Sequence, residues 1–162
     1  MIDHTIPPVF DKESRILILG SFPSVRSREA RFFYGHPQNR FWKVVAAVFD
    51  EPVPSSIGQK RDFLLRNHIA VWDVIASCDI EGSSDSSIKN VIPNDLGIIL
   101  EAAPVEKIFI NGRTAEKYYN KYIGKTIGTD ALTLPSTSPA NAAWSLERLI
   151  EAWSIIRKET DK

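Results

Sequence analysis

Two kinds of hydrophobic pattern alternate along the chain: short continuous runs, and longer stretches with helical spacing. The continuous runs lie at residues 15–20, 69–74, 107–110 and 131–134. Runs of this length predict strands that are buried on both faces of a sheet. Apolar residues spaced three and four apart lie over residues 39–49, 115–122 and 142–158. This spacing places one apolar stripe along a helix, so these segments are predicted to be helical.

Capping residues predict two further helices. Ser56 and Gln59 match a capping box, which predicts a helix that continues to about Asn67. Asn94 can cap a helix over residues 95–103. The alternation of strands with helices therefore continues through the middle of the chain.

The order of elements predicts an α/β fold, a three-layer αβα sandwich with a central four-stranded parallel sheet, as one domain over residues 1–162. In such sheets ligands bind outside the carboxyl ends of the strands. These ends are residues 20–24, Asp73, residues 111–112 and residues 135–138. Polar residues and turn formers gather there, so this edge is the predicted active site.

Two segments are predicted to be loops. Residues 21–38 separate the first strand from the first helix. Residues 76–93 are rich in Gly, Ser, Asp and Asn, which is typical of a loop that is either functional or merely solvated.

Composition narrows the class of protein. A hydrophobic content of 43% and a charged content of 25% are typical of a soluble globular domain. The single cysteine, Cys78, cannot form an intramolecular disulfide and makes a Cys-ligated metal site implausible. No apolar run approaches the length of a membrane span, and the first residues lack a leader pattern. We expect a cytoplasmic protein that is not processed.

Sequence motifs exclude several chemistries. Gly20 does not begin a GxGxxG or P-loop motif, so a nucleotide cofactor is not expected. There is no GxSxG nucleophile elbow, and His4, His36 and His68 lack the HExxH spacing. We therefore expect no metal, no cofactor and no serine-hydrolase triad.

Positive charge and aromatic rings coincide in one window of a chain whose net charge is zero. Residues 24–43 hold five basic residues against one acid, a local charge of +4. The aromatic residues in and beside the window are Phe22, Phe32, Phe33, Tyr34, Phe41 and Trp42. Enzymes that flip a base out of DNA stack the base on an aromatic ring and grip the flanking phosphates. The window predicts this function, and Arg26, Arg28 and Arg31 are expected to contact phosphates. The alternative is that the aromatic residues form the core beneath a helix and the basic residues form a solvated face.

Two motifs resemble those of a known family. Residues 20–24 (GSFPS), followed by residues 33–42 (FYGHPQNRFW), resemble the first motif of the uracil-DNA glycosylase superfamily, especially its mismatch-specific branch. Residues 134–141 (LPSTSPAN) are similar to the second motif, a Pro-Ser turn after the last strand. The resemblance extends over about residues 15–156.

The departures from these motifs point to one family within the superfamily. The residue that activates water in the other branches, an Asn or Asp third in the first motif, is replaced by Phe22. The His or Asn that opens the second motif is replaced by Leu134 or Pro135. Both features are similar to the hypoxanthine-DNA (deoxyinosine) glycosylases, which implies that Asn39 is the catalytic residue. Its carboxamide oxygen can accept a hydrogen bond from water and aim it at the anomeric carbon, or it can cap a helix.

The resemblance also implies roles for other residues. Tyr34 aligns with the aromatic on which the flipped base stacks, and main-chain groups of Ser21 and Phe22 would contact the base edge. Asp73 and Asn111, at two strand ends, read the base or only cap turns. Ser136, Thr137 and Ser138 are expected to contact DNA.

The sequence therefore predicts a monomeric, monofunctional DNA glycosylase that releases hypoxanthine and leaves an abasic site. No lysine at a strand end offers a Schiff-base nucleophile. The alternatives are a uracil or mismatch-specific glycosylase, a non-catalytic nucleic-acid or nucleotide-binding module, and a hydrolase of free nucleosides.

Overall fold

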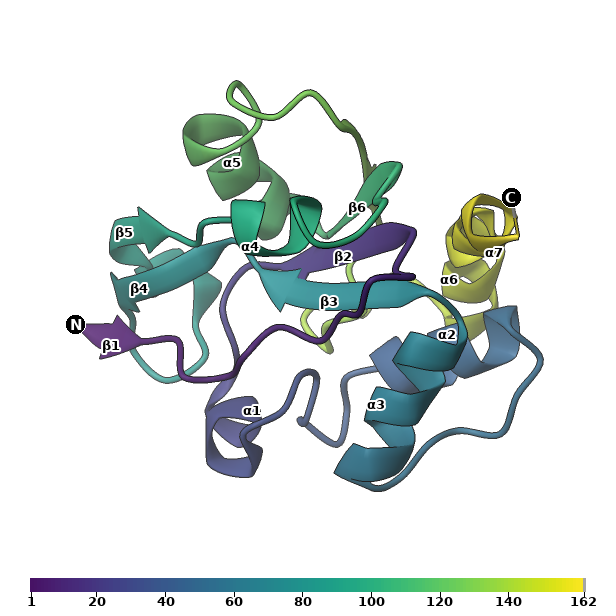
Figure 1. Ribbon diagram of the computed structural model, residues 1–162. Coiled ribbons are helices and arrows are strands. Elements are labelled where there is room, and N and C mark those ends of the chain that lie inside the picture. Colours follow the sequence, from purple (N-terminus) through teal and green to yellow (C-terminus); the bar gives the residue numbers. More distant parts are fainter. Residues whose placement is uncertain (162) are drawn as a thin grey trace.

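A parallel sheet of four strands forms the centre of the computed structural model, which describes residues 1–161 (Figure 1). In the order β3-β2-β6-β7, the strands are Ile69–Asp73, Ile16–Gly20, Lys107–Asn111 and Asp130–Leu134. Neighbouring strands are parallel throughout. The strands β2 and β3 are buried at every residue. The predicted fold class and the positions of all four predicted strands are confirmed. The predicted burial on both faces is wrong for β7, which lies at the edge of the sheet and is exposed from Asp130 to Leu132.

Helices cover both faces of this sheet (Figure 1). The helices α2 (Phe41–Val48) and α3 (Ile57–Arg66) lie on one side, and α5 (Arg113–Tyr122) lies on the other. The apolar stripe predicted for α2 is buried, and both halves of the Ser56 capping box are formed at the start of α3. The strand ends stay uncovered by these helices, which leaves that edge open for a pocket.

The predicted last helix is two helices. The first, α6 (Leu146–Trp153), begins later than predicted because the Ser145 side chain caps it by accepting a hydrogen bond from the Arg148 amide. The second, α7 (Ile155–Thr160), follows a break at Ser154, whose hydroxyl donates to the Ile150 carbonyl at 2.7 Å. Such back-bonding bends helices, which accounts for the break.

The predicted helix over residues 95–103 is mostly wrong, since only α4 (Gly97–Leu100) forms. The side chain of Asn94 does not cap it. It donates instead to the carbonyls of Asp73 and Ile75, at 2.8 and 3.2 Å. The residue therefore ties the segment to the end of β3.

The predicted loop over residues 76–93 is also wrong. The strands β4 (Ile75–Asp79) and β5 (Lys89–Pro93) pair as an antiparallel hairpin, joined through the short 3-10 turn η1 (Asp85–Ser87). A third strand, β1 (Ile2–Asp3), pairs with β4 and completes a second sheet in the order β1-β4-β5. Register shifts between β4 and β5, and the Ser-rich connection, hide the alternation that a regular hairpin shows in sequence.

The predicted loop over residues 21–38 contains a helix, α1 (Val25–Ala30). Ser24 caps it by accepting a hydrogen bond from the Ser27 amide at 3.2 Å. Several aromatic side chains of the basic window belong to the core, with Phe33 and Phe41 at most 2% exposed. No helix within residues 1–161 is long and apolar enough to span a membrane.

Candidate active site

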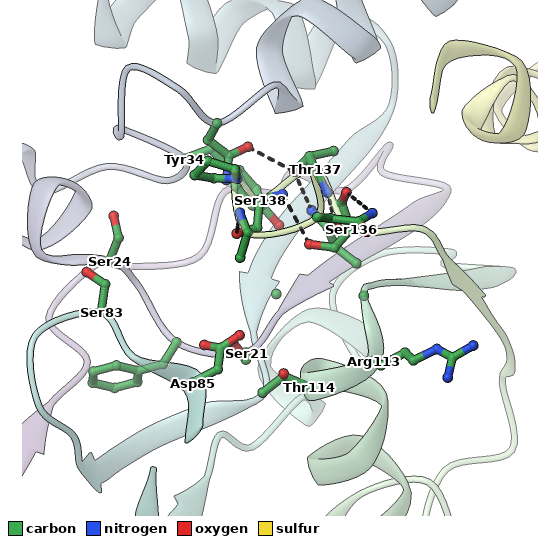
Figure 2. Close-up of a pocket in the computed structure, with 18 of the residues that line it drawn as sticks. Ser21, Ser24, Tyr34, Ser83, Asp85, Arg113, Thr114, Ser136, Thr137 and Ser138 are labelled. Carbon is green, nitrogen blue, oxygen red and sulfur yellow. Dashed lines mark hydrogen bonds between the residues drawn. The ribbon is translucent and has the colours of Figure 1, made fainter. Parts of the chain in front are cut away.

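A cavity of about 970 Å³ lies at the carboxyl ends of the parallel strands (Figure 2). The residues predicted to bind the base or catalyse all line it: Ser21, Phe22, Tyr34, Asn39, Asp73 and Asn111. Ser136, Thr137 and Ser138 line it as well. Figure 2 shows Tyr34 and Thr137 on one side of the pocket and Asp85 and Thr114 on the other. The structure therefore brings these predicted site residues together around one cavity at the predicted edge of the sheet.

Asn39 both lines the pocket and holds the start of α2. Its Oδ1 accepts hydrogen bonds from the Phe41 amide and from the Thr137 hydroxyl, each at 2.9 Å. Its Nδ2 makes no hydrogen bond to any other residue that the structure describes. A carbonyl oxygen has two lone pairs, so Oδ1 is fully used and Nδ2 is the part of the amide that is available to a ligand.

Thr137 connects two of the predicted site residues and is fully buried. Its hydroxyl, which donates to Asn39, accepts a hydrogen bond from Asn111 Nδ2 at 3.0 Å. The Thr137 amide donates to Asn111 Oδ1 at 3.1 Å. The structure thus gives Thr137 and Asn111 a bridging role between the end of β6 and the start of α2, and Thr137 is not exposed for a phosphate contact.

Arg40 holds the segment that follows β7. Its amide donates to the Thr137 carbonyl at 3.0 Å. Its guanidinium group donates to the carbonyls of Asn141, at 3.0 Å, and Trp144. On the other side of the segment, the Trp153 indole donates to the Pro135 carbonyl at 2.9 Å. The two sequence motifs are therefore fastened to each other, and the pocket wall they share is fixed.

Asp73 ends β3 at the floor of the pocket and pairs with His4. Asp73 Oδ2 lies 2.8 Å from His4 Nε2, and the two side chains are 5% and 2% exposed. The rings of Phe22, Phe33 and Trp72 surround the imidazole. The carboxylate is therefore held by one polar partner within apolar walls.

Tyr34 adopts a left-handed backbone conformation, with φ of 53°, and its ring stacks on Phe41 with centroids 3.9 Å apart. Its hydroxyl is buried and makes no hydrogen bond, although Asp73 and Asn111 are near. Burial, and next the charge of Asp73, raise the pKa of Tyr34 far above its ordinary value, while the Asn111 amide lowers it. The phenol is neutral at physiological pH and has an unused donor.

The three arginines predicted to contact phosphate lie outside the pocket lining. Arg26 and Arg31 are exposed on and just after α1. Arg28 is engaged within the protein, because it donates to the Gly82 carbonyl at 2.5 Å and lies over the Phe22 ring at 5.7 Å. The Val25 amide also donates to Ser83 Oγ, at 2.9 Å. Together these bonds fasten the β4–β5 connection to α1.

Sequence reasoning missed two groups: His4, which holds Asp73 without lining the pocket, and Asp85, which lines it. His4 gave no signal, because it lies 69 residues from Asp73 in the chain and matches no motif. Asp85 lies in the segment predicted to be a loop and faces Thr114; burial raises the pKa of its carboxyl, and the Thr114 hydrogen bond lowers it. Among residues 1–161 no cluster of three or more His, Cys, Asp or Glu side chains is placed to hold a metal ion.

Comparison with known proteins finds relatives over most of the chain. A family model described as the uracil DNA glycosylase superfamily matches residues 7–157. A hypoxanthine DNA glycosylase of Methanosarcina acetivorans is 36% identical over 159 residues, which cover 97% of this chain and 99% of that one. Another, of Methanosarcina barkeri, is 35% identical over 150 residues, covering 91% and 93%. The solution NMR structure of a protein from M. acetivorans, provisionally assigned as a uracil DNA glycosylase, superposes with a TM-score of 0.84 at 35% identity over the full length of both chains.

Proposed function

Because this chain belongs to the uracil DNA glycosylase superfamily, we propose that it hydrolyses the N-glycosidic bond of a deaminated base flipped out of DNA, with hypoxanthine as its principal substrate. The chain is a DNA glycosylase, a hydrolase acting on N-glycosyl bonds. The observation that supports the substrate is the pocket floor, where Asp73 offers a carboxylate oxygen to a base edge. The product is an abasic site in an uncut strand.

Asn39 is the proposed catalytic residue. As the bond to the base breaks, positive charge develops on the sugar and negative charge on the base, so a water molecule must be in place on the sugar. Its oxygen forms the bond to the anomeric carbon, the glycosidic electron pair leaves with the base, and the water proton passes to the base or to solvent. Because Asn39 Oδ1 already accepts two hydrogen bonds, we infer that Nδ2 donates to this water and holds it.

The base is proposed to stack on the face of Tyr34 that Phe41 does not cover. Main-chain groups of Ser21 and Phe22 contact the base edge, where the turn after β2 lets the backbone approach closely. Asn111 donates a hydrogen bond to the Thr137 hydroxyl, which donates in turn to Asn39, so Asn111 helps to hold Asn39 in position beside the base. Phe22, in the position of the usual water-activating residue, forms a wall of the pocket.

The DNA backbone is proposed to lie across the rim. The hydroxyls of Ser136 and Ser138 accept hydrogen bonds from nearby amides, which leaves each hydroxyl proton available to a phosphate oxygen. Arg26 and Arg31 supply exposed positive charge beside the pocket. We further propose a cytoplasmic monomer of one domain that works without cofactor or metal.

Base release decides the function. Oligonucleotides with one deoxyinosine or one deoxyuridine are incubated with the protein, and free base and abasic sites are measured. We expect hypoxanthine release, and uracil release as the second candidate, because a carboxylate at Asp73 accepts the N–H of either base. Asn39→Ala is the matched inactive control and should still bind DNA. Folded protein that releases neither base refutes the proposal, and salt-sensitive binding without release favours a binding module instead.

A further inference from the structure

We propose that His4 is a positioning residue that orients Asp73 to recognise the ring N–H and adjacent carbonyl that deamination creates in a base. This inference rests on the proposed function. His4 lies outside residues 7–157, the part of the chain that the family model matches. The second sheet places it against Asp73, because β1 pairs with β4 and the His4 amide donates to the Ala76 carbonyl at 2.7 Å.

The hydrogen bonds of His4 determine which of its nitrogens carries the proton. The Ile6 amide donates to His4 Nδ1 at 3.3 Å, so Nδ1 is an acceptor. Nε2 therefore carries the hydrogen of the neutral ring and donates it to Asp73 Oδ2 at 2.8 Å. A hydrogen bond to an ionised carboxylate is among the stronger kinds. It fixes Oδ2 against the imidazole and sets the rotation of the whole carboxylate.

The other carboxylate oxygen, Oδ1, is directed to the pocket floor beside the Tyr34 hydroxyl. A Cβ atom placed on Gly20 would lie 2.5 Å from Asp73 Oδ1 and 3.1 Å from the Tyr34 hydroxyl oxygen. The two polar atoms therefore converge over Gly20, where only a glycine leaves room for them. The Tyr34 hydroxyl is buried and has no hydrogen-bond partner among residues 1–161, so the nearby Asp73 Oδ1 is the polar atom of this corner that is offered to a base.

An acceptor beside a donor matches the edge of a deaminated base. Hypoxanthine presents N1–H beside the C6 carbonyl, and uracil presents N3–H beside the C4 carbonyl. Asp73 Oδ1 can accept the N–H, and a main-chain amide of Ser21 or Phe22 can donate to the carbonyl. Adenine and cytosine present the opposite order, a ring nitrogen lone pair beside an amino group, so the carboxylate meets a lone pair and the bond is lost. Guanine shares the hypoxanthine edge, and its 2-amino group must be excluded elsewhere in the pocket.

Without His4, the Asp73 carboxylate loses this orientation. Its Oδ2 would face the apolar rings that now enclose the imidazole, with no donor. A buried carboxylate without a partner rotates toward another donor or takes up a proton. In either case Oδ1 stops being a fixed acceptor, and recognition of the N–H is weakened.

Two substitutions test this role. His4→Gln keeps an N–H donor close to the position of Nε2, and His4→Leu removes it. Each protein acts on DNA with hypoxanthine or with unsubstituted purine, a base that lacks both N1–H and the C6 carbonyl. In His4→Leu we expect the preference for hypoxanthine over purine to fall at least about tenfold, the loss of one hydrogen bond to a charged group. In His4→Gln we expect it to stay within a few-fold of the wild type.

A merely structural role predicts a different result, because a loosened pocket slows both substrates equally. An unchanged preference in His4→Leu overturns the proposal, and so does a His4→Gln variant that loses as much as His4→Leu. If His4→Leu does not fold, His4→Phe, which keeps a ring in this place but has no N–H donor, replaces it in the comparison with His4→Gln. Binding of DNA that carries 2′-fluorinated forms of the two nucleosides, which resist hydrolysis, gives the same preference without turnover. If the wild-type protein prefers hypoxanthine in binding but releases no base, the proposed function is refuted and this inference stands. If it binds the hypoxanthine DNA and the purine DNA equally, the inference is refuted.

Discussion

The hydroxyl of Thr137 donates a hydrogen bond to the amide oxygen of Asn39 at 2.9 Å, across 98 residues of sequence. This bond joins the proposed water-binding residue to the turn after the last strand. Because the same hydroxyl accepts from Asn111, one buried oxygen aligns three pocket residues that come from different elements. The position of Asn39 therefore depends on a side chain that does not itself need to touch DNA.

Thr137→Val should disturb this alignment. The substitution keeps the shape of the side chain and removes one hydrogen bond from Asn39 Oδ1 and one from Asn111 Nδ2, so we expect a loss of about 2 kcal/mol in the free energy of unfolding. Base release should fall at least about tenfold as Asn39 loses its position. Thr137→Ser retains the hydroxyl and serves as the control. Equal activity of the two variants in single-turnover release would show that the bond does not position Asn39.

Asn39→Asp separates two ways of holding water. Both accepted hydrogen bonds survive in this variant, but the amide nitrogen becomes an acceptor oxygen. If Nδ2 donates to the water, as we infer, Asn39→Asp should release hypoxanthine as slowly as Asn39→Ala. Single-turnover release rates of the three proteins measure this. An Asp variant that keeps or exceeds wild-type activity would show that acceptance of a water proton is the important step.

Gly20→Ala should block base binding. The added methyl carbon would lie 2.5 Å from Asp73 Oδ1, so the carboxylate must move off its place in the pocket floor. We expect affinity for deoxyinosine DNA to fall toward that for undamaged DNA, measured by titration of the two duplexes. Gly128→Ala offers a matched control, since no atom lies within 4 Å of the added carbon there. Normal affinity in Gly20→Ala would contradict the proposed placement of the base.

Salt dependence reports how many phosphates are bound. The local charge of +4 lies in a neutral chain, and Arg28 and Arg40 are already engaged with backbone carbonyls. We expect a log–log slope of about −2 to −4, which corresponds to two to four neutralised phosphates. Arg26→Ala and Arg31→Ala should each make it shallower by about 1. Titrations between low and moderate salt measure the slope, and a value near −8 would require a much larger footprint.

One surface contact predicts a pH dependence of stability. The pKa of Glu51 is held below its ordinary value, mainly by a hydrogen bond from Arg66. A hydrogen bond from Asn67 and the positive charge of Arg66 lower it further. A lowered folded-state pKa stabilises the protein above the unfolded-state pKa, and the effect is lost as the pH falls through the folded-state value. Glu51→Gln should therefore lower the free energy of unfolding by less than about 1 kcal/mol near pH 7, because the Glu51–Arg66 pair is partly solvated. Near pH 3 the substitution should have a smaller effect.

Urea denaturation at the two pH values checks this. Asp50→Asn removes the neighbouring exposed carboxylate, which makes no ion pair with the residues that the structure describes. Its effect should be the same at both pH values. A Glu51→Gln cost that persists at pH 3 would show that packing rather than charge accounts for it.

The sequence predicts the central sheet well because parallel strands buried on both faces leave continuous apolar runs, as in residues 15–20 and 69–74. It predicts the pocket because parallel strand ends share one edge. It fails for β1 and for the hairpin of β4 and β5, whose partly exposed and irregularly paired strands carry no strict alternation.

The site is predicted in its residues and less well in their roles. Asn39 is consistent in sequence with capping or with catalysis. In the structure its Oδ1 accepts from the Phe41 amide at the start of α2, although Arg40 is the N-cap residue, and its Nδ2 has no partner among residues 1–161. Thr137 is a pocket residue as predicted, but burial gives it a bridging role. His4 could not be found, because a contact between residues 69 positions apart leaves no local pattern.

The short strand β1 carries the chain into His4, so discrimination between damaged and undamaged bases depends on a strand that is expected to open easily. Strand β1 has two residues and lies at the edge of the second sheet, so it is expected to open locally at a small fraction of the free energy that unfolds the core. Such opening would withdraw His4 while Asn39 and Thr137 stay in place. Under mild heating or low denaturant, the protein should therefore begin to accept undamaged bases before its turnover or its global fold is lost.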